Sequence, residues 1–238
     1  PIFTQLALPT VPSPANGRPK ATVDRTTDPG TAVTTFPVDG ELWQGVARLA
    51  RRQRTTPFTV LLTAFVAEFF AGATEALVPV LTPGRIPSEW GTVGCLFNML
   101  AMRLDLTDAP GGEELLRRVD TTCREAYVND IPLQPVLRGT PELAAALTAR
   151  DRVLPFFQYV PPPPLRPLVD DPALDLVPLP DTPLVMPLLP TALLWRFSGA
   201  GPVTGHACYD PALFDGDWVA DRVDGYLHRL GHLVGDSS

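Results

Sequence analysis

The sequence has 238 residues, of which 45% are hydrophobic and 19% are charged. This is enough apolar material for the core of one large domain or of one lobe of a larger protein. The formal net charge is -7, and the basic residues form no block. Nucleic acid and anionic membrane surfaces are therefore excluded as expected partners, because phosphate recognition needs clustered Lys and Arg side chains.

The cysteine and hydropathy patterns indicate a cytoplasmic protein. Cys95, Cys123 and Cys208 make an odd number without CxxC spacing, which predicts buried, reduced thiols rather than a disulfide framework or a zinc site. The sequence shows no signal peptide and no run of 18 apolar residues, so we expect no membrane span. Because it begins with Pro1 and not with Met, we expect a segment processed or excised from a longer protein.

Local patterns divide the chain into alternating strands and helices. Residues 1–31 hold Pro, Gly, Thr and Asp without a sustained period and predict a linker or a lobe-crossing segment. The expected elements, in chain order, are a strand over 32–37, helices over 39–54 and 58–70, strands over 77–81 and 95–106, helices over 113–128 and 142–149, strands over 156–160, 192–197 and 203–209, and a helix over 217–234. This alternation indicates an α/β layered domain with a largely buried sheet.

The second expected helix has the most distinctive start signal. Thr56 can cap it with its hydroxyl, and Pro57 follows at the first helical position, where the missing N–H has no intrahelical partner to lose. Over 58–70 the helix is apolar almost all round. This pattern indicates burial on more than one side.

The composition changes over residues 161–190, which contain eleven prolines, four of them consecutive. Proline lacks the N–H donor that a helix or a sheet ladder needs, so this segment is expected to be an extended loop. Loops of this length inside a compact domain usually have a function or cover another surface.

Residues 93–103 (VGCLFNMLAMR) resemble the strand motif IGxFVNTLALR of nonribosomal peptide synthetase condensation domains. The identical positions include Gly94, Asn98 and Arg103. Met99 stands where the family commonly has Thr. Just upstream, residues 82–85 (TPGR) are similar to the family's TPxAGR turn, in a shortened form.

Two further motifs follow in the family's order. Residues 129–133 (NDIPL) are similar to the (H/N)QDYPFE segment, and residues 150–158 (RDRVLPFFQ) resemble RDxSRNPLFQ without its Ser-Arg pair. The matching positions include Asp130, Pro132, Arg150 and Asp151. Together with fitting segments at 56–58 and 209–215, these motifs make the resemblance specific over roughly residues 36–234.

The resemblance implies a fold and a set of partners. Members of the family have two lobes of the chloramphenicol acetyltransferase type that face each other across a tunnel. Each lobe is an α/β two-layer sandwich with a mostly buried mixed sheet and helices on one face. Residues 32–238 would form the C-terminal lobe, with 161–190 as a latch-like excursion toward the N-terminal lobe. The other implied partners are adjacent synthetase domains and peptidyl carrier proteins with their phosphopantetheine arms; no directly bound cofactor is implied.

The family's catalytic motif HHxxxDG belongs to the first lobe, and the present sequence does not contain it. The histidines of the chain are His206, His228 and His232, and we assign none of them a catalytic role. His228 and His232 have the spacing to face one metal ion from a helix, but no third ligand is evident and Arg229 lies between them. We therefore predict no metal site and interpret this pair as suited to a helix C-terminus; His206 is predicted to be structural.

Two residues are candidates for the tunnel. Asn98 places an amide in an otherwise apolar strand, which indicates either a tunnel-facing side chain or one that satisfies a neighbouring backbone group. Arg85 follows a Pro-Gly turn and is expected either to reach the opposing lobe or to be solvated. The other matched residues are interpreted as structural: Gly94, Arg103, Asp130, Pro132, Arg150 and Asp151, the last two as a local ion pair and cap.

The resemblance implies amide-bond formation between a carrier-bound acyl donor and an amine acceptor, with this half supplying one tunnel wall. Because the HHxxxDG motif is not in the sequence, we expect the chain alone to be inactive. The alternatives are a catalytically inert docking module that recruits a tailoring enzyme or a carrier protein, and an ester- or heterocycle-forming relative of the same fold. An isolated lobe would expose its inter-lobe face, so self-association is expected.

Overall fold

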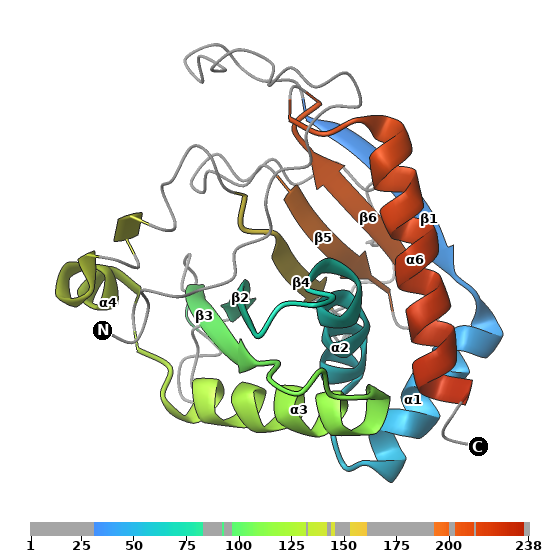
Figure 1. The fold of residues 1–238 in the computed structure, drawn as a ribbon, viewed down its shortest axis with the longest axis horizontal. Coiled ribbons are helices and arrows are strands. Elements are labelled where there is room, and N and C mark those ends of the chain that lie inside the picture. The colour runs from blue at the N-terminus through green and yellow to red at the C-terminus, as the bar shows by residue number, and fades with distance from the viewer. Residues whose placement is uncertain are drawn as a thin grey trace, which may run out of the picture.

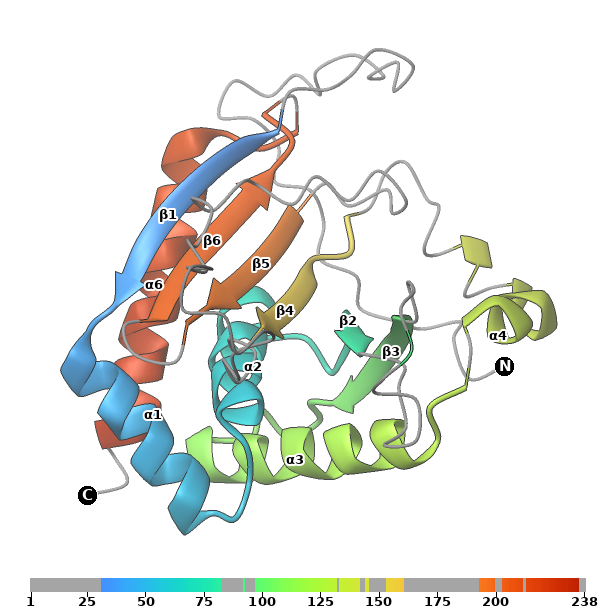
Figure 2. The ribbon, with the colours of Figure 1, turned by 180° about the vertical axis from the view of Figure 1, so that it is seen from behind.

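The computed structural model describes residues 31–82, 92, 97–131, 133–141, 144–145, 153–160, 193–199, 203–211 and 213–235. In chain order they form β1 (Ala32–Val38), α1 (Gly40–Arg52), α2 (Pro57–Phe69), β2 (Glu75–Thr82), β3 (Asn98–Asp105), α3 (Gly112–Val128), α4 (Leu133–Gly139), β4 (Phe156–Val160), β5 (Leu193–Ser198), β6 (Val203–Tyr209) and α6 (Gly216–Gly235). Figure 1 shows α2 and α6 in front of the twisted sheet and α3 below it, and Figure 2 shows the sheet from behind.

The six strands form one mixed sheet in the order β1-β6-β5-β4-β2-β3. β4 runs parallel to both of its neighbours, β2 and β5, whereas the other pairings are antiparallel. The expected α/β sandwich with a mixed sheet is therefore confirmed.

The helix-covered face of the sheet holds the main core. Alternation along each strand sends every second side chain to this face. Phe36, Trp195, Phe197 and Tyr226 pack there with ring centroids between 5.4 and 6.1 Å apart. Tilted and edge-on aromatic pairs of this kind add about 0.5–1.5 kcal/mol each beyond the burial of their surface, so this cluster fixes β1, β5 and α6 against one another.

The caps of the first two helices agree with the sequence pattern. The Asp39 carboxylate accepts a hydrogen bond from the Leu42 backbone N–H at 2.8 Å, and the Thr56 hydroxyl accepts one from the Thr59 backbone N–H at 3.2 Å. α2 then contacts α1, α3, α6 and β4. This confirms the expected burial of α2 on more than one side.

The opposite face of the sheet carries a second, smaller set of apolar side chains. Met99, Phe156, Leu194 and Cys208 form a buried cluster on it. At the β2–β3 end of this face, α4 packs Val136 and Leu137 into one cluster with Leu77 and Ala101. Most of the described helical surface therefore lies on one side of the sheet, with α4 as an addition to the other.

The structure differs from the expected elements in a few places. The sequence pattern misses α4, because its seven residues include Pro135 and are too short to show a helical period. β3 begins at Asn98 rather than at residue 95. The expected linker at 1–31, the proline-rich segment 161–190 and most of the expected helix at 142–149 lie outside the described residues. In the part of the chain that is described, no helix combines the length and apolar character needed to cross a membrane.

Candidate functional site

A polar junction lies where β2 ends, β3 begins and α3 ends. The Asn98 side-chain amide donates hydrogen bonds to the Asp130 carboxylate and, at 2.9 Å, to the Ile131 carbonyl oxygen. The Thr82 hydroxyl donates to the other Asp130 carboxylate oxygen at 3.2 Å. This Asn98–Asp130 junction, formed by Thr82, Asn98, Asp130 and Ile131, ties two neighbouring strands to the segment that follows a helix.

The strand register and the end of α3 create the junction. Thr82 and Asn98 are paired directly in the antiparallel β2–β3 ladder, so their side chains share one face of the sheet. At the end of α3, the backbone N–H and the side-chain amide of Asn129 donate to the Glu125 carbonyl oxygen at 3.0 and 2.8 Å. The next residue, Asp130, is thereby placed against the strands.

The junction brings together two motifs that are separate in the sequence. Asn98 belongs to the first motif and Asp130, 32 positions later, to the second. The bond from Asn98 to the Ile131 carbonyl fits the interpretation of a side chain that satisfies a neighbouring backbone group. A position facing a tunnel stays a prediction for Asn98.

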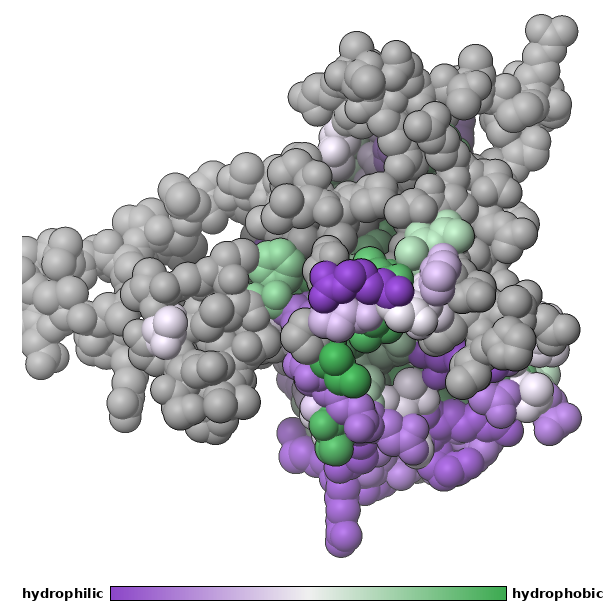
Figure 3. Space-filling model, turned by 90° about the vertical axis from the view of Figure 1, so that its left-hand side faces the viewer, coloured by the Kyte–Doolittle hydropathy of each residue, from purple (hydrophilic) through white to green (hydrophobic). Residues whose placement is uncertain are grey.

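Exposed apolar side chains lie at the junction and close to its residues along the chain. Four of them, called the junction patch below, are Phe97 (43% exposed), Tyr127 (44%), Val128 (85%) and Ile131 (54%). Figure 3 shows green apolar groups that interrupt the purple polar surface on this side of the molecule. Apolar surface with a polar surround is typical of a contact site. The sequence gives no signal for it, because these residues follow no common helix or strand period.

A row of polar side chains crosses the other face of the sheet. Gln158, Arg196, His206 and Thr35 are successive cross-strand partners on β4, β5, β6 and β1. His206 is only 7% exposed, and its Nδ1 and Nε2 atoms lie 3.4 Å from the Thr35 hydroxyl and 3.5 Å from the Ser198 hydroxyl. These neighbours fit the structural role predicted for His206.

The two described cysteines are poorly suited to nucleophilic chemistry. Burial raises the pKa of the Cys123 thiol to about 12, and the nearby Asp120 charge adds to this effect. Burial also raises the pKa of Cys208, against the opposing charge of Arg196. Because the thiolate is the reactive form, both thiols are expected to be inert near neutral pH. Cys95 lies outside the described residues.

Comparison with curated proteins finds relatives among peptide synthetases. No protein-family model matches the chain. Linear gramicidin synthase subunits B and C of Brevibacillus parabrevis are 36% and 35% identical to it over 106 and 137 residues, which are 43% and 56% of this chain. The matched stretch is 2% of the length of either subunit, so the chain spans only a small part of these relatives.

Solved structures show which part of such proteins the chain resembles. The SgcC5 protein of Streptomyces globisporus aligns with a TM-score of 0.68 and 25% identity over 87% of this chain and 48% of its own. The first condensation domain of the CDA synthetase aligns with a TM-score of 0.63 and 15% identity over 86% of this chain and 44% of its own. The chain has the fold of the C-terminal lobe of a condensation domain. This lobe also aligns with the X-domain in its complex with OxyB from teicoplanin biosynthesis, with a TM-score of 0.72 and 16% identity over 99% of this chain and 51% of that chain.

Several candidate residues of the lobe cannot be placed in the site. Arg85, Gly94, Pro132, Arg150 and Asp151 lie outside the described residues, so their tunnel or structural roles stay predictions. Arg103 is described and forms an ion pair with Glu75 across the β2–β3 ladder. This contact fits the structural interpretation of Arg103.

One ionic cluster of the lobe, built around a buried carboxylate, is not predicted from the sequence. Glu68 in α2 is 7% exposed, and its two carboxylate oxygens bind the guanidinium groups of Arg222 and Arg229 in α6, each at 2.7 Å. This Glu68 clamp, formed by Glu68, Arg222 and Arg229, fastens the two helices to each other. The spacing of Arg222 and Arg229 can be seen in the sequence and places both on one face of a helix. Their shared partner, Glu68, can be identified only from the fold.

Removing the Asp130 carboxylate is expected to loosen the junction without unfolding the lobe. Asp130→Ala removes one of the two acceptors of the Asn98 amide and the acceptor of the Thr82 hydroxyl, at a cost of about 1 kcal/mol, because the carboxylate that is removed is exposed. Amide hydrogen exchange should become faster at the end of α3 and the start of β3. Asp221→Ala, which removes an exposed carboxylate from α6, is the control, and equal acceleration in both variants would contradict the prediction.

Proposed function

We propose that this lobe supplies one wall of the acyl-transfer tunnel in a nonribosomal peptide synthetase condensation domain. Such a domain forms an amide bond between a carrier-bound acyl donor and an amine acceptor. The observation that carries the proposal is the Asn98–Asp130 junction, where two segments that resemble condensation-domain motifs meet. The similarity to gramicidin synthase subunits supports the same class of reaction.

In the proposed reaction, the acceptor nitrogen attacks the thioester carbonyl carbon of the donor. The C–N bond forms, the C–S bond breaks, and the proton lost by the amine balances the charge of the departing thiolate. Both substrates would be carried by the phosphopantetheine arms of peptidyl carrier proteins, delivered from adjacent synthetase domains in the cytoplasm. Holding donor and acceptor in line supplies a large share of the rate enhancement in such reactions. The proposed tunnel wall would contribute to this alignment without itself transferring a proton.

The junction offers a rigid point for such a wall. Both acceptors of the Asn98 amide, the Asp130 carboxylate and the Ile131 carbonyl oxygen, belong to the segment after α3, so strand and segment hold each other in place. In the proposal, Asn98 lines the tunnel here and Arg85 extends from the preceding turn toward the N-terminal lobe. The junction patch would then lie beside the opening through which a carrier protein presents its substrate.

The proposal predicts that the 238-residue chain alone forms no amide product above the uncatalysed background. The chain contains no HHxxxDG motif, and a positioned acid–base group typically contributes a factor of about 10²–10⁴. The purified chain would be incubated with acylated and aminoacylated carrier proteins, and the product measured by mass spectrometry. Turnover close to that of a complete condensation domain, the positive control, would contradict the prediction.

A fusion tests the positive part of the proposal. Joining the chain behind an N-terminal lobe that carries an intact HHxxxDG motif is expected to restore turnover. Asn98→Ala should then lower turnover in this fusion, whereas Asp221→Ala on the outer surface of α6 should not. A folded fusion without turnover would count against the tunnel-wall function.

Light scattering on the chain alone would test the expected self-association through its inter-lobe face.

A second candidate function is that of a catalytically inert docking module. The likeness of fold to the X-domain, which was solved in complex with OxyB, favours this candidate. The junction patch would then be a contact surface for a tailoring enzyme or a carrier protein. The parent reading frame separates the two functions, because an intact HHxxxDG motif upstream of Pro1 favours catalysis and a degraded one favours docking.

A further inference from the structure

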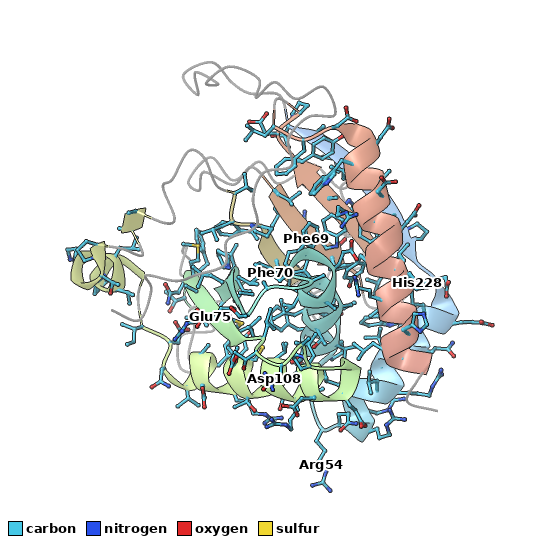
Figure 4. All side chains as sticks on the ribbon, in the orientation of Figure 1. Arg54, Phe69, Phe70, Glu75, Asp108 and His228 are labelled. Atoms are coloured by element: carbon cyan, nitrogen blue, oxygen red, sulfur yellow. The ribbon has the colours of Figure 1, made fainter. Side chains whose placement is uncertain are left out.

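Two histidines on the outer side of α6 lie close enough to share a ligand. His228 and His232 are both exposed, and their Nε2 atoms are 3.2 Å apart, with the two rings at 73° to each other. Figure 4 shows His228 on the side of α6 that is turned away from α2. A group from solvent can therefore reach both imidazoles at once.

The separation of the two nitrogen atoms fits coordination of one metal ion. Nitrogen ligands at about 2.0–2.1 Å from Zn²⁺ lie about 3.3 Å apart when the angle between them is tetrahedral, and about 2.9 Å apart at a right angle. The observed 3.2 Å falls between these two values. The same 3.2 Å is a hydrogen-bond distance, so a bound ion would replace a contact in which one imidazole donates to the other.

Arg229 lies between the histidines in the sequence but is drawn away from them in space. Its Nε atom donates to the Glu68 carboxylate at 2.7 Å, and Arg222 binds the other oxygen of that carboxylate at 2.7 Å. The guanidinium of Arg229 is therefore directed toward α2, where a buried carboxylate compensates its charge. This removes one of the two objections that the sequence raises against a metal ion at the histidine pair, the other being that no third ligand is evident.

The surroundings of the pair also favour a cation. Asp221 and Asp224 are exposed on the preceding turns of the same side of α6, so their carboxylates add negative potential there. Interaction with the helix dipole, which the sequence suggests for both histidines, accounts for only one of them. It acts within the last turn, which contains His232, while His228 lies one turn earlier.

We propose that His228 and His232 form a binding site for one divalent transition-metal ion of the zinc type, with water in the remaining coordination positions. Imidazole nitrogen is a good ligand for Zn²⁺, Cu²⁺ and Ni²⁺. Among the residues that the structure describes, no group of three or more His, Cys, Asp or Glu side chains could hold a metal ion. The site is therefore open and surface-bound, and its affinity comes from two ligands held at the right spacing by one helix.

Zinc titration of the 238-residue chain tests the proposal. Isothermal titration calorimetry is expected to show one Zn²⁺ bound per chain. His228→Ala and His232→Ala should each weaken Zn²⁺ binding by about tenfold or more, because either change leaves only one imidazole to bind the ion. His206→Gln, at the buried histidine on β6, is the matched control and should leave the affinity for Zn²⁺ unchanged.

The outcomes separate this site from other zinc ligands of the chain. Absence of Zn²⁺ binding would overturn the proposal. Binding that survives the removal of either exposed histidine would also overturn it, because the ion would then be bound elsewhere, for example by a thiol. Circular dichroism of each variant verifies that the fold is kept. Both substituted histidines are exposed, so their removal is expected to leave the fold intact.

Discussion

Replacing Gly205 by alanine is expected to destabilise the lobe by about 3 kcal/mol, the upper end of the usual cost of overpacking a core. An added Cβ would lie 2.3 Å from two carbon atoms of the Phe36 ring and 2.9 Å from a third. Gly205 and Phe36 are directly paired across the β1–β6 ladder. The ring has little room to move, because Trp195, Phe197 and Tyr226 enclose it.

Urea unfolding followed by circular dichroism would measure this effect. A double-mutant cycle with Phe36→Leu provides the control, because the smaller side chain frees the space that the new methyl group needs. The cost of Gly205→Ala should fall by about 1–3 kcal/mol in the Phe36→Leu background. An equal cost in both backgrounds would show that contact with the ring is not the cause.

The strand around Gly205 illustrates how far the sequence predicts this fold. The local pattern over 203–209 predicts β6, and the capping signals at Asp39 and Thr56 predict the starts of α1 and α2, because these features depend on neighbours in the chain. The requirement for glycine at position 205 depends instead on Phe36, which lies far away in the sequence and opposite in the sheet. Local patterns carry no information about such close approaches.

The candidate site shows the same division. Asn98 and Asp130 can be selected from the sequence because the segments around them resemble known motifs. Their hydrogen bond cannot be predicted in the same way, because it requires both the β2–β3 register and the turn after Asn129. The junction patch is even harder to predict from the sequence, since the exposure of a side chain depends on the folded surface and not on the residue type.

The Glu68 clamp leads to the second large effect. Alanine in place of glycine inside a helix ordinarily stabilises it by about 1 kcal/mol. At Gly225 in α6 we expect the opposite sign, because a Cβ there would lie 2.7–2.8 Å from three atoms of the Glu68 carboxyl group. Arg222 and Arg229 hold that carboxylate in place. Gly225→Ala is therefore expected to destabilise the lobe by about 2 kcal/mol.

Gly231 in the same helix is the matched control for Gly225. A Cβ at Gly231 would have no neighbouring atom within 4 Å, so Gly231→Ala should stabilise the lobe by about 0.5–1 kcal/mol. Thermal unfolding of the two variants should therefore move the midpoint in opposite directions from that of the original chain. A shift in the same direction would mean that the Glu68 carboxylate can yield to the methyl group, and that the clamp does not fix the distance between α2 and α6.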